Sequence, residues 1–132
     1  MSNMDDFNRC TALVLAHLYD AFPQEVHPFK LADLEPDLSE NTAKNFAATV
    51  VFLAEEHFIV CGKATHDGMT LTHARLTSKG LATLKSIPEA IAGEEKTSFA
   101  DKIKAVVKDG GKQSINTVIS QTIAAFVKIA VF

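Results

Sequence analysis

The spacing of apolar residues predicts a long first helix. Between Asp5 and Ala21, apolar side chains recur every three or four residues, as on a helix with one buried face. Pro23 follows and ends this helix, because proline lacks the N–H group that a helix interior requires. The positions expected to face the core are Phe7, Cys10, Leu13, Val14, His17, Leu18 and Ala21.

Two more helices are predicted before residue 57. A short one is expected from Pro28 through Leu34, since proline sacrifices no hydrogen bond in the first helical turn. Ser39 is a candidate N-cap for the next helix, because its hydroxyl can accept a hydrogen bond from a free N–H of the first turn. We expect that helix to run to about Glu56. Its inward-facing side chains are Phe46, Val50 and Leu53.

Two runs rich in strand-forming residues follow the third helix. They are Phe58–Gly62 and Met69–Leu76, and in the second run alternate residues are expected to face opposite sides. Asp67–Gly68 lies between them and is a common turn sequence. The pair therefore predicts a β-hairpin with a polar tip.

Thr77 is expected to cap another helix directly after the hairpin, and Pro88 to stop it. Within this helix, Leu81, Leu84 and Ile87 share helical spacing. We expect Leu81 and Leu84 to pack back on the first helix.

The chain divides by composition into three parts. Residues 1–88 are predicted to form a compact domain, and residues 89–98, which mix Pro, Gly and charge, a linker. Residues 99–132 contain two amphipathic helices separated at Gly110–Gly111.

Composition favours a compact cytoplasmic protein. Of 132 residues, 47% are hydrophobic, which suffices to offset the conformational entropy lost when one domain folds. The first residues lack the pattern of a secretory signal. Cys10 and Cys61 lie in apolar surroundings and are expected to be buried free thiols rather than a disulfide. The apolar stretch 114–132 carries too many polar residues for a membrane span, which takes about 20 mostly apolar residues.

Two segments resemble winged helix-turn-helix regulators such as the MarR and PadR families. TVVFLAEEHFIV, Thr49–Val60, is similar to the end of a recognition helix and the first wing strand, and ARLTSKGLATL, Ala74–Leu84, to the second wing strand and the helix after it. The resemblance spans about residues 5–87. It implies a mainly α fold with a small β-hairpin, in which a winged helix-turn-helix is followed by C-terminal amphipathic helices. It also implies a DNA-binding transcriptional regulator, whose third helix enters a groove of double-stranded DNA and whose hairpin is the wing.

The sequence departs from the family pattern at His57. Such families usually have glycine at this position, because glycine adopts the positive φ that lets a helix end and a strand begin. Either His57 accepts that backbone conformation or the helix ends differently.

The candidate DNA contacts lie on the outer face of the third helix and on the hairpin. Asparagine can bond an adenine edge through two hydrogen bonds, and basic side chains can meet phosphates. The same positions fit an ordinary solvated face, because Glu40, Glu55 and Glu56 on or near this helix would repel phosphates and the net charge is −3. The candidate contacts are Asn41, Lys44, Asn45, Thr49, Lys63, His66 and Arg75.

No motif indicates catalysis, and we predict no enzyme activity, no cofactor and no metal. Asp109–Ser114 (DGGKQS) lacks the spacing of a phosphate-binding loop. The hairpin contains residue types that bind zinc, but without the usual ligand spacing. These are Cys61, His66, Asp67 and His73. His17 is expected to be a core histidine with a hydrogen-bond partner.

The last helix presents a broad apolar face, which includes Val127, that must be covered. It could pack on its own domain, pair with a second chain or lie in a membrane interface. We favour a homodimer or higher homo-oligomer, because few basic residues flank the face to attract anionic lipid and because a dimer would place two recognition helices about 34 Å apart. The expected interface residues are Ile115, Ile119, Ile123, Phe126 and Ile129.

A second function from a different class is also compatible with the sequence. A winged-helix scaffold can serve as a non-catalytic protein-interaction or assembly module that does not bind DNA. The acidic balance and the apolar C-terminal segment favour this alternative.

Overall fold

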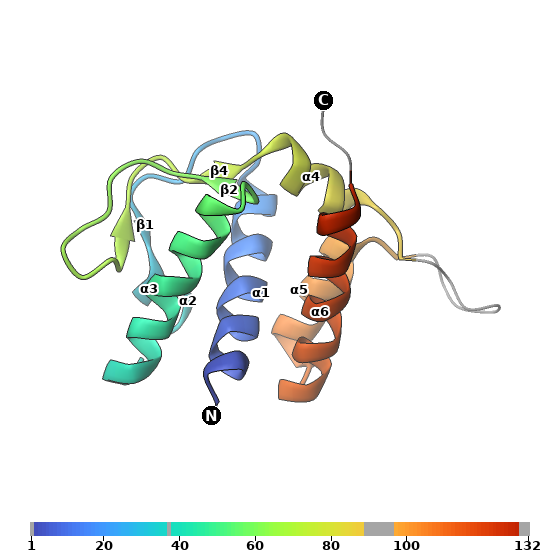
Figure 1. Ribbon diagram of the computed structural model, residues 1–132, viewed down its shortest axis with the longest axis horizontal. Coiled ribbons are helices and arrows are strands. Elements are labelled where there is room, and N and C mark those ends of the chain that lie inside the picture. Colours follow the sequence, from blue (N-terminus) through green and yellow to red (C-terminus); the bar gives the residue numbers. More distant parts are fainter. Residues whose placement is uncertain (1, 37, 89–96, 130–132) are drawn as a thin grey trace.

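Helix α1 lies at the centre of the protein, with α3 on one side and α5 and α6 on the other (Figure 1). The computed structural model describes residues 2–36, 38–88 and 97–129. In this part of the chain the fold is mainly helical with small antiparallel two-stranded sheets. The four long helices are α1 Asn3–Ala21, α3 Glu40–Glu55, α5 Phe99–Asp109 and α6 Lys112–Lys128.

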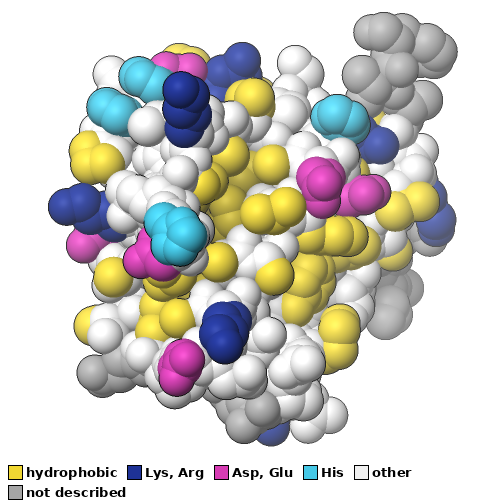
Figure 2. All heavy atoms as spheres, turned by 60° about the vertical axis from the view of Figure 1, so that its left-hand side comes forward, with side chains coloured by type: hydrophobic (Ala, Val, Ile, Leu, Met, Phe, Trp, Pro, Cys, Tyr) yellow, Lys and Arg dark blue, Asp and Glu magenta, His cyan; other side chains and the backbone are white. Residues whose placement is uncertain are grey.

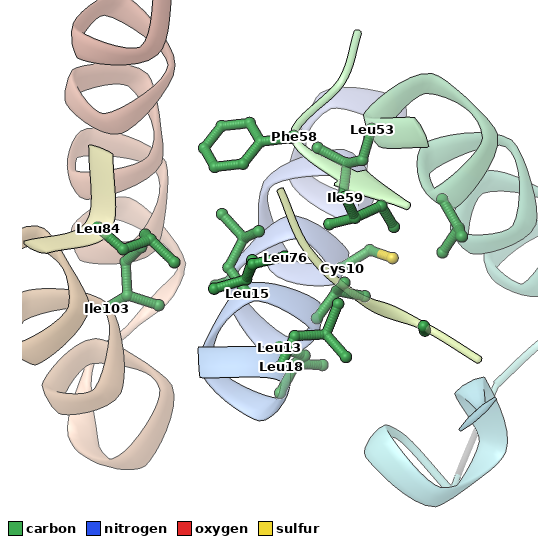
Figure 3. Close-up of a cluster of buried hydrophobic side chains, with 14 of the residues drawn as sticks. Cys10, Leu13, Leu15, Leu18, Leu53, Phe58, Ile59, Leu76, Leu84 and Ile103 are labelled. Atoms are coloured by element: carbon green, nitrogen blue, oxygen red, sulfur yellow. The ribbon is translucent and has the colours of Figure 1, made fainter. Parts of the chain in front are cut away.

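Helix α1 begins with a reciprocal cap and ends beside a proline. The Ser2 hydroxyl accepts from the backbone N–H of Asp5, and the Asp5 carboxylate accepts from that of Ser2. Phe22 is the C-cap, as expected from Pro23. The buried apolar side chains of α1 point in several directions, so the helix is enclosed by other elements (Figure 3). They are Cys10, Ala12, Leu13, Val14, Leu15 and Leu18.

The segment after α1 differs from the prediction. Phe29–Lys30 forms strand β1, and helix α2 begins only at Leu31 and ends at Leu34. The expected helix start at Pro28 is therefore wrong. The reason is long-range, because β1 pairs antiparallel with β3, Thr70–Leu71, and this extended backbone keeps the Phe29 ring inside the core.

The predicted ribbon between residues 57 and 77 is present. Strand β2, Ile59–Val60, pairs antiparallel with β4, Arg75–Leu76. A further bridge joins Ala64 to Leu71, and Gly68 at the tip has a φ of 75°. This is the polar-tipped hairpin that the sequence predicts.

The second run of the hairpin does not keep strict alternation. His73, with a φ of 49°, interrupts it, so that β3 pairs with β1 and β4 pairs with β2. Leu71 and Ala74 are both buried although they are three residues apart. In an unbroken strand they would face opposite sides. The left-handed residue between them turns both toward the core.

Helix α4, Ser78–Lys85, begins at the predicted cap. The Thr77 hydroxyl accepts from the N–H of Gly80 and donates to the carbonyl of His57, which ties the helix start to the end of α3. Two expectations fail here. Ile87 lies beyond the helix and is exposed, and α4 packs mainly on α5 and α6 rather than on α1.

An aromatic stack joins α6 to the start of the hairpin. The rings of Phe58 and Phe126 are parallel, with centroids 4.0 Å apart. The ammonium group of Lys79 lies 4.3 Å from the centroid of the Phe126 ring. These contacts, together with the packing of α4, position the C-terminal helix.

The C-terminal helices cover their own chain. They are separated at Gly110–Gly111, as predicted, and α5 and α6 both pack on α1. Their buried side chains belong to the same hydrophobic cluster as those of α1 and α3. Residues 89–96 of the predicted linker lie outside the described residues.

This packing corrects the predicted oligomer interface. Ile115, Ile119 and Phe126 are buried inside the chain, so in this fold they are not available to a second copy. Ile123 and Ile129 are partly buried. Val127, assigned to the covered face, is 72% exposed because the helix turns it away from α1. Of the alternatives weighed above for this face, the chain adopts packing on its own body.

Polar side chains join the N-terminal turns of α1 and α6. Asn8 Nδ2 donates to Asn116 Oδ1 over 3.0 Å, and Asn116 Nδ2 donates to Asp5 Oδ1 over 3.0 Å. Lys112 Nζ lies 3.3 Å from the other Asp5 oxygen. The hydrogen bond from Asn116, followed by that from the Ser2 N–H, holds the pKa of Asp5 well below its usual range.

We predict that Ile119→Ala lowers the free energy of unfolding by about 2–5 kcal/mol, because it leaves a cavity between α6 and α1. Val127→Ala on the same helix is the control and should change it by less than about 0.5 kcal/mol. Urea unfolding followed by circular dichroism measures both. Equal effects would show that α6 does not pack on α1 in solution.

We also predict that stability falls when the pH drops below about 4, the ordinary pKa of an aspartate. The pKa of Asp5 is lower in the folded chain, so on acidification the unfolded chain binds the proton first. The ionised carboxylate therefore stabilises the fold above that pH, and its contribution is lost as the pH falls. Asp5→Asn should show a shallower loss in urea titrations between about pH 5 and pH 2.

Candidate interaction surface

The outer face of α3 and the hairpin beside it carry the predicted site residues. Phe46, Val50 and Leu53 of α3 are buried, as predicted. The tip of the hairpin touches the helix, since a Cβ added to Gly68 would lie 3.0 Å from the Cβ of Ala47. Seven residues at the outer face and the C-terminal end of α3 are exposed. They are Asn41, Lys44, Ala48, Val51, Phe52, Glu55 and Glu56.

Two predicted DNA contacts instead face α1. Asn45 Nδ2 donates to Asp6 Oδ2 over 2.8 Å and to Asn3 Oδ1 over 3.1 Å. Thr49 is buried, and its hydroxyl donates to the Asn45 carbonyl over 2.6 Å. The prediction that these two side chains contact DNA is therefore corrected. Asn45 connects the two helices, and Thr49 is buried beside it, because both positions adjoin the buried face of α3.

The remaining predicted contacts are spread over the surface. Asn41 and Lys44 are exposed on α3, and the Lys44 ammonium group lies 3.8 Å from Glu40. Lys63 and His66 are exposed on the hairpin. The exposed predicted contacts therefore lie on two separate elements, the helix α3 and the hairpin.

Arg75 is held at the base of the hairpin. Its Nη1 donates to the carbonyl of Leu76 over 3.1 Å, and its Nε lies 3.9 Å from Glu25. Glu25 also lies 3.2 Å from Nδ1 of His73, whose ring stacks on that of His27. The Arg75 guanidinium is therefore half-buried and already engaged by the protein.

Many positive charges have a carboxylate neighbour. The pair of Arg9 and Glu35 joins α1 to the segment after α2. The others are Lys44 with Glu40, Arg75 with Glu25, Lys104 with Asp20, and Lys112 with Asp5. On the face that presents α3 and the hairpin, basic side chains are scattered singly among acidic ones (Figure 2).

Hydrophobic side chains fill the middle of this face (Figure 2). A shallow groove lies between α1, α3 and α6, with Phe7, Ala48 and Ile123 among its lining residues. The rings of Phe7 and Phe52 meet edge to face with centroids 5.5 Å apart. Three apolar residues of α1 and α3 are exposed to solvent: Met4 is 62% exposed, Val51 51% and Phe52 41%.

Sequence reasoning missed this apolar surface. Val50–Leu53 is a run of four apolar residues, which is wider than the single stripe that a helix needs for one buried face. The width of this apolar run was the feature of the sequence that could have indicated an exposed apolar surface. We define the α3 stripe as Lys44, Ala48, Val51 and Glu55, four exposed residues along one line of the helix, which Glu40 continues one turn before Lys44.

His57 settles the question of how α3 ends. It has a φ of 66°, so this histidine accepts the left-handed backbone that glycine usually provides. The strand then starts at once, and the N–H of Phe58 donates to the carbonyl of Leu53.

The described residues contain no group of three or more His, Cys, Asp or Glu side chains that could hold a metal ion. His17 is exposed and stacks on Phe29 with centroids 5.8 Å apart, so the prediction of a core histidine is wrong. Both thiols are free, with Cys10 buried and Cys61 only partly so. Burial raises the pKa of each.

Comparisons with protein-family models, curated proteins and solved structures find no match to this chain. Within the described residues, no helix combines the length and the apolar character needed to cross a membrane.

We predict that Asn45→Ala lowers the free energy of unfolding by about 1–3 kcal/mol, because it removes the hydrogen bond to the buried carboxylate of Asp6. Asn41→Ala is the matched control, with the same change in helix propensity at an exposed position, and should not destabilise the fold. Urea denaturation compares the two variants. Equal stabilities would remove Asn45 from the contact between α1 and α3.

Proposed function

We propose that this chain is a winged-helix scaffold that acts as a non-catalytic protein-interaction module and binds an apolar protein surface through the outer face of α3. The order of elements supports the winged-helix part of the proposal. A helix, a short strand, two helices, an antiparallel ribbon and a further helix follow one another, and the ribbon lies beside α3. The resemblance of Thr49–Val60 and Ala74–Leu84 supports the same architecture.

The exposed apolar surface is the observation that carries the interaction part. Single exposed apolar residues are common on protein surfaces, but adjacent ones that line a groove are typical of binding sites. Met4, Phe7 and Phe52 adjoin one another across α1 and α3. Covering such side chains gains about 25 cal/mol for each Å² of apolar surface removed from water.

Electrostatics favours a protein partner over DNA. Glu55 and Glu56 stand exposed at the end of α3, and Glu40 at its start, where they would face phosphates if the helix entered a groove. DNA carries one negative charge per about 1.7 Å of helix axis, so each carboxylate would weaken binding. Lys44 is the one basic residue within α3.

DNA binding as a transcriptional regulator is the second candidate function. Lys44, Lys63 and His66 favour it, because they are exposed on the helix and the hairpin that a winged helix uses for DNA. In that arrangement α3 would lie in the major groove, and the hairpin would contact the flanking phosphates.

A gel-shift titration with mixed genomic DNA fragments at low salt distinguishes the two functions. We expect no salt-sensitive retardation of the DNA, and no difference between the wild type and the Lys44→Ala/Lys63→Ala variant. Retardation that weakens with salt and is lost in this variant would instead establish DNA binding and overturn the proposed function.

A further inference from the structure

The α3 stripe has a self-complementary order of charges. Lys44, Ala48, Val51 and Glu55 are separated by four, three and four residues, so the pattern has the same spacing from either end. At 100° per residue, the four positions lie within about 60° of the helix circumference. All four residues are exposed. A basic residue thus stands at one end, an acidic one at the other, and apolar ones between them.

We propose that the partner bound by this face is a second copy of the chain, with the two α3 helices packed antiparallel around a two-fold axis between Ala48 and Val51. This inference rests on the proposed function and names its partner. In this arrangement Lys44 of each copy meets Glu55 of the other, and Ala48 of each meets Val51 of the other. A two-fold interface uses the same patch on both chains, so each contact occurs twice.

The side chains of the stripe suit this packing. Ala48 is small, which lets the helix axes approach to the 8–10 Å of close helix packing. Phe52 and Met4 flank the stripe and would lose their exposed surface to the second copy. The apolar middle would provide the free energy, and the charges at the ends would set the antiparallel orientation.

The two charges of the stripe do not neutralise each other within one chain. Lys44 and Glu55 are eleven residues apart on one helix, which is about 16 Å along its axis. The described neighbour of Lys44 is Glu40, at 3.8 Å and exposed to water, an interaction of small energy. In the proposed dimer, Glu55 of the second copy adds a further carboxylate beside Lys44, next to Glu40 of the same chain.

This dimer and insertion of α3 into DNA exclude each other, because both use the same face. The proposed dimer also places self-association at α3 rather than at α6, because the apolar side chains of α6 are covered within the chain. Helix α3 lies on the opposite side of α1 from α5 and α6 (Figure 1). Ile123 of α6 contributes to the groove that borders the stripe, and the four stripe residues stay exposed.

Sedimentation equilibrium of the full chain tests the proposal through charge reversal. The wild type is expected to approach twice the monomer mass of 14.3 kDa as its concentration rises. Lys44→Glu and Glu55→Lys should each raise the dimer dissociation constant about tenfold or more, because each replaces two attractive pairs by two repulsive ones. The double variant Lys44→Glu/Glu55→Lys should restore the wild-type constant. Lys108→Glu on α5 is the control and should have no effect.

Three results would overturn the proposal: a monomeric wild type up to millimolar concentration, single reversals that leave the dimer intact, and a double reversal that does not restore it. Circular dichroism verifies that each variant is folded. Should a charge variant misfold, Val51→Arg, at an exposed position, tests the same face and must also abolish the dimer.

The gel-shift assay separates this inference from the proposed function. If the chain is monomeric and does not bind DNA, the dimer is overturned but the proposed protein-interaction function is not. DNA binding that depends on α3 overturns the function itself.

Discussion

The enclosure of α1 is the constraint on which the rest of the structure depends. Apolar side chains of this helix point in several directions, so no single neighbour can cover them. Helix α3 covers one side, α5 and α6 cover another, and strand β4 also packs against the helix (Figure 1). Each fully buried leucine or valine contributes about 1.5–3 kcal/mol. Residues 99–129 therefore contribute to the same core as the residues up to Leu84.

This enclosure also determines which side chains of α3 face solvent. At the inner edge of α3, Asn45 donates a hydrogen bond to the buried carboxylate of Asp6 on α1. What is left outside includes Lys44, an apolar middle and glutamates at both ends of the helix. A surface of this kind suits an apolar protein partner better than phosphates. The functional proposal thus follows from how α3 packs on α1.

Local features of the sequence predicted much of the fold. The caps at Ser39 and Thr77 and the break at Gly110–Gly111 were predicted correctly, because each depends on hydrogen bonds or dihedral angles within a few residues. The hairpin between residues 57 and 77 was predicted from two runs of strand-forming residues with the turn sequence Asp67–Gly68 between them. The start of α2 was not, because Phe29–Lys30 pairs with residues about forty positions later in the chain.

For the candidate site, the sequence by itself determined which helix carries the face and that its charges are mixed. Only the tertiary structure decided which residues of α3 face α1, which bonded Asn45 to Asp6, buried Thr49 and left Val51 and Phe52 exposed. It likewise decided that α6 covers its own chain. Periodicity reports how wide an apolar face is, but the neighbour that covers the face is selected by packing between segments far apart in the sequence.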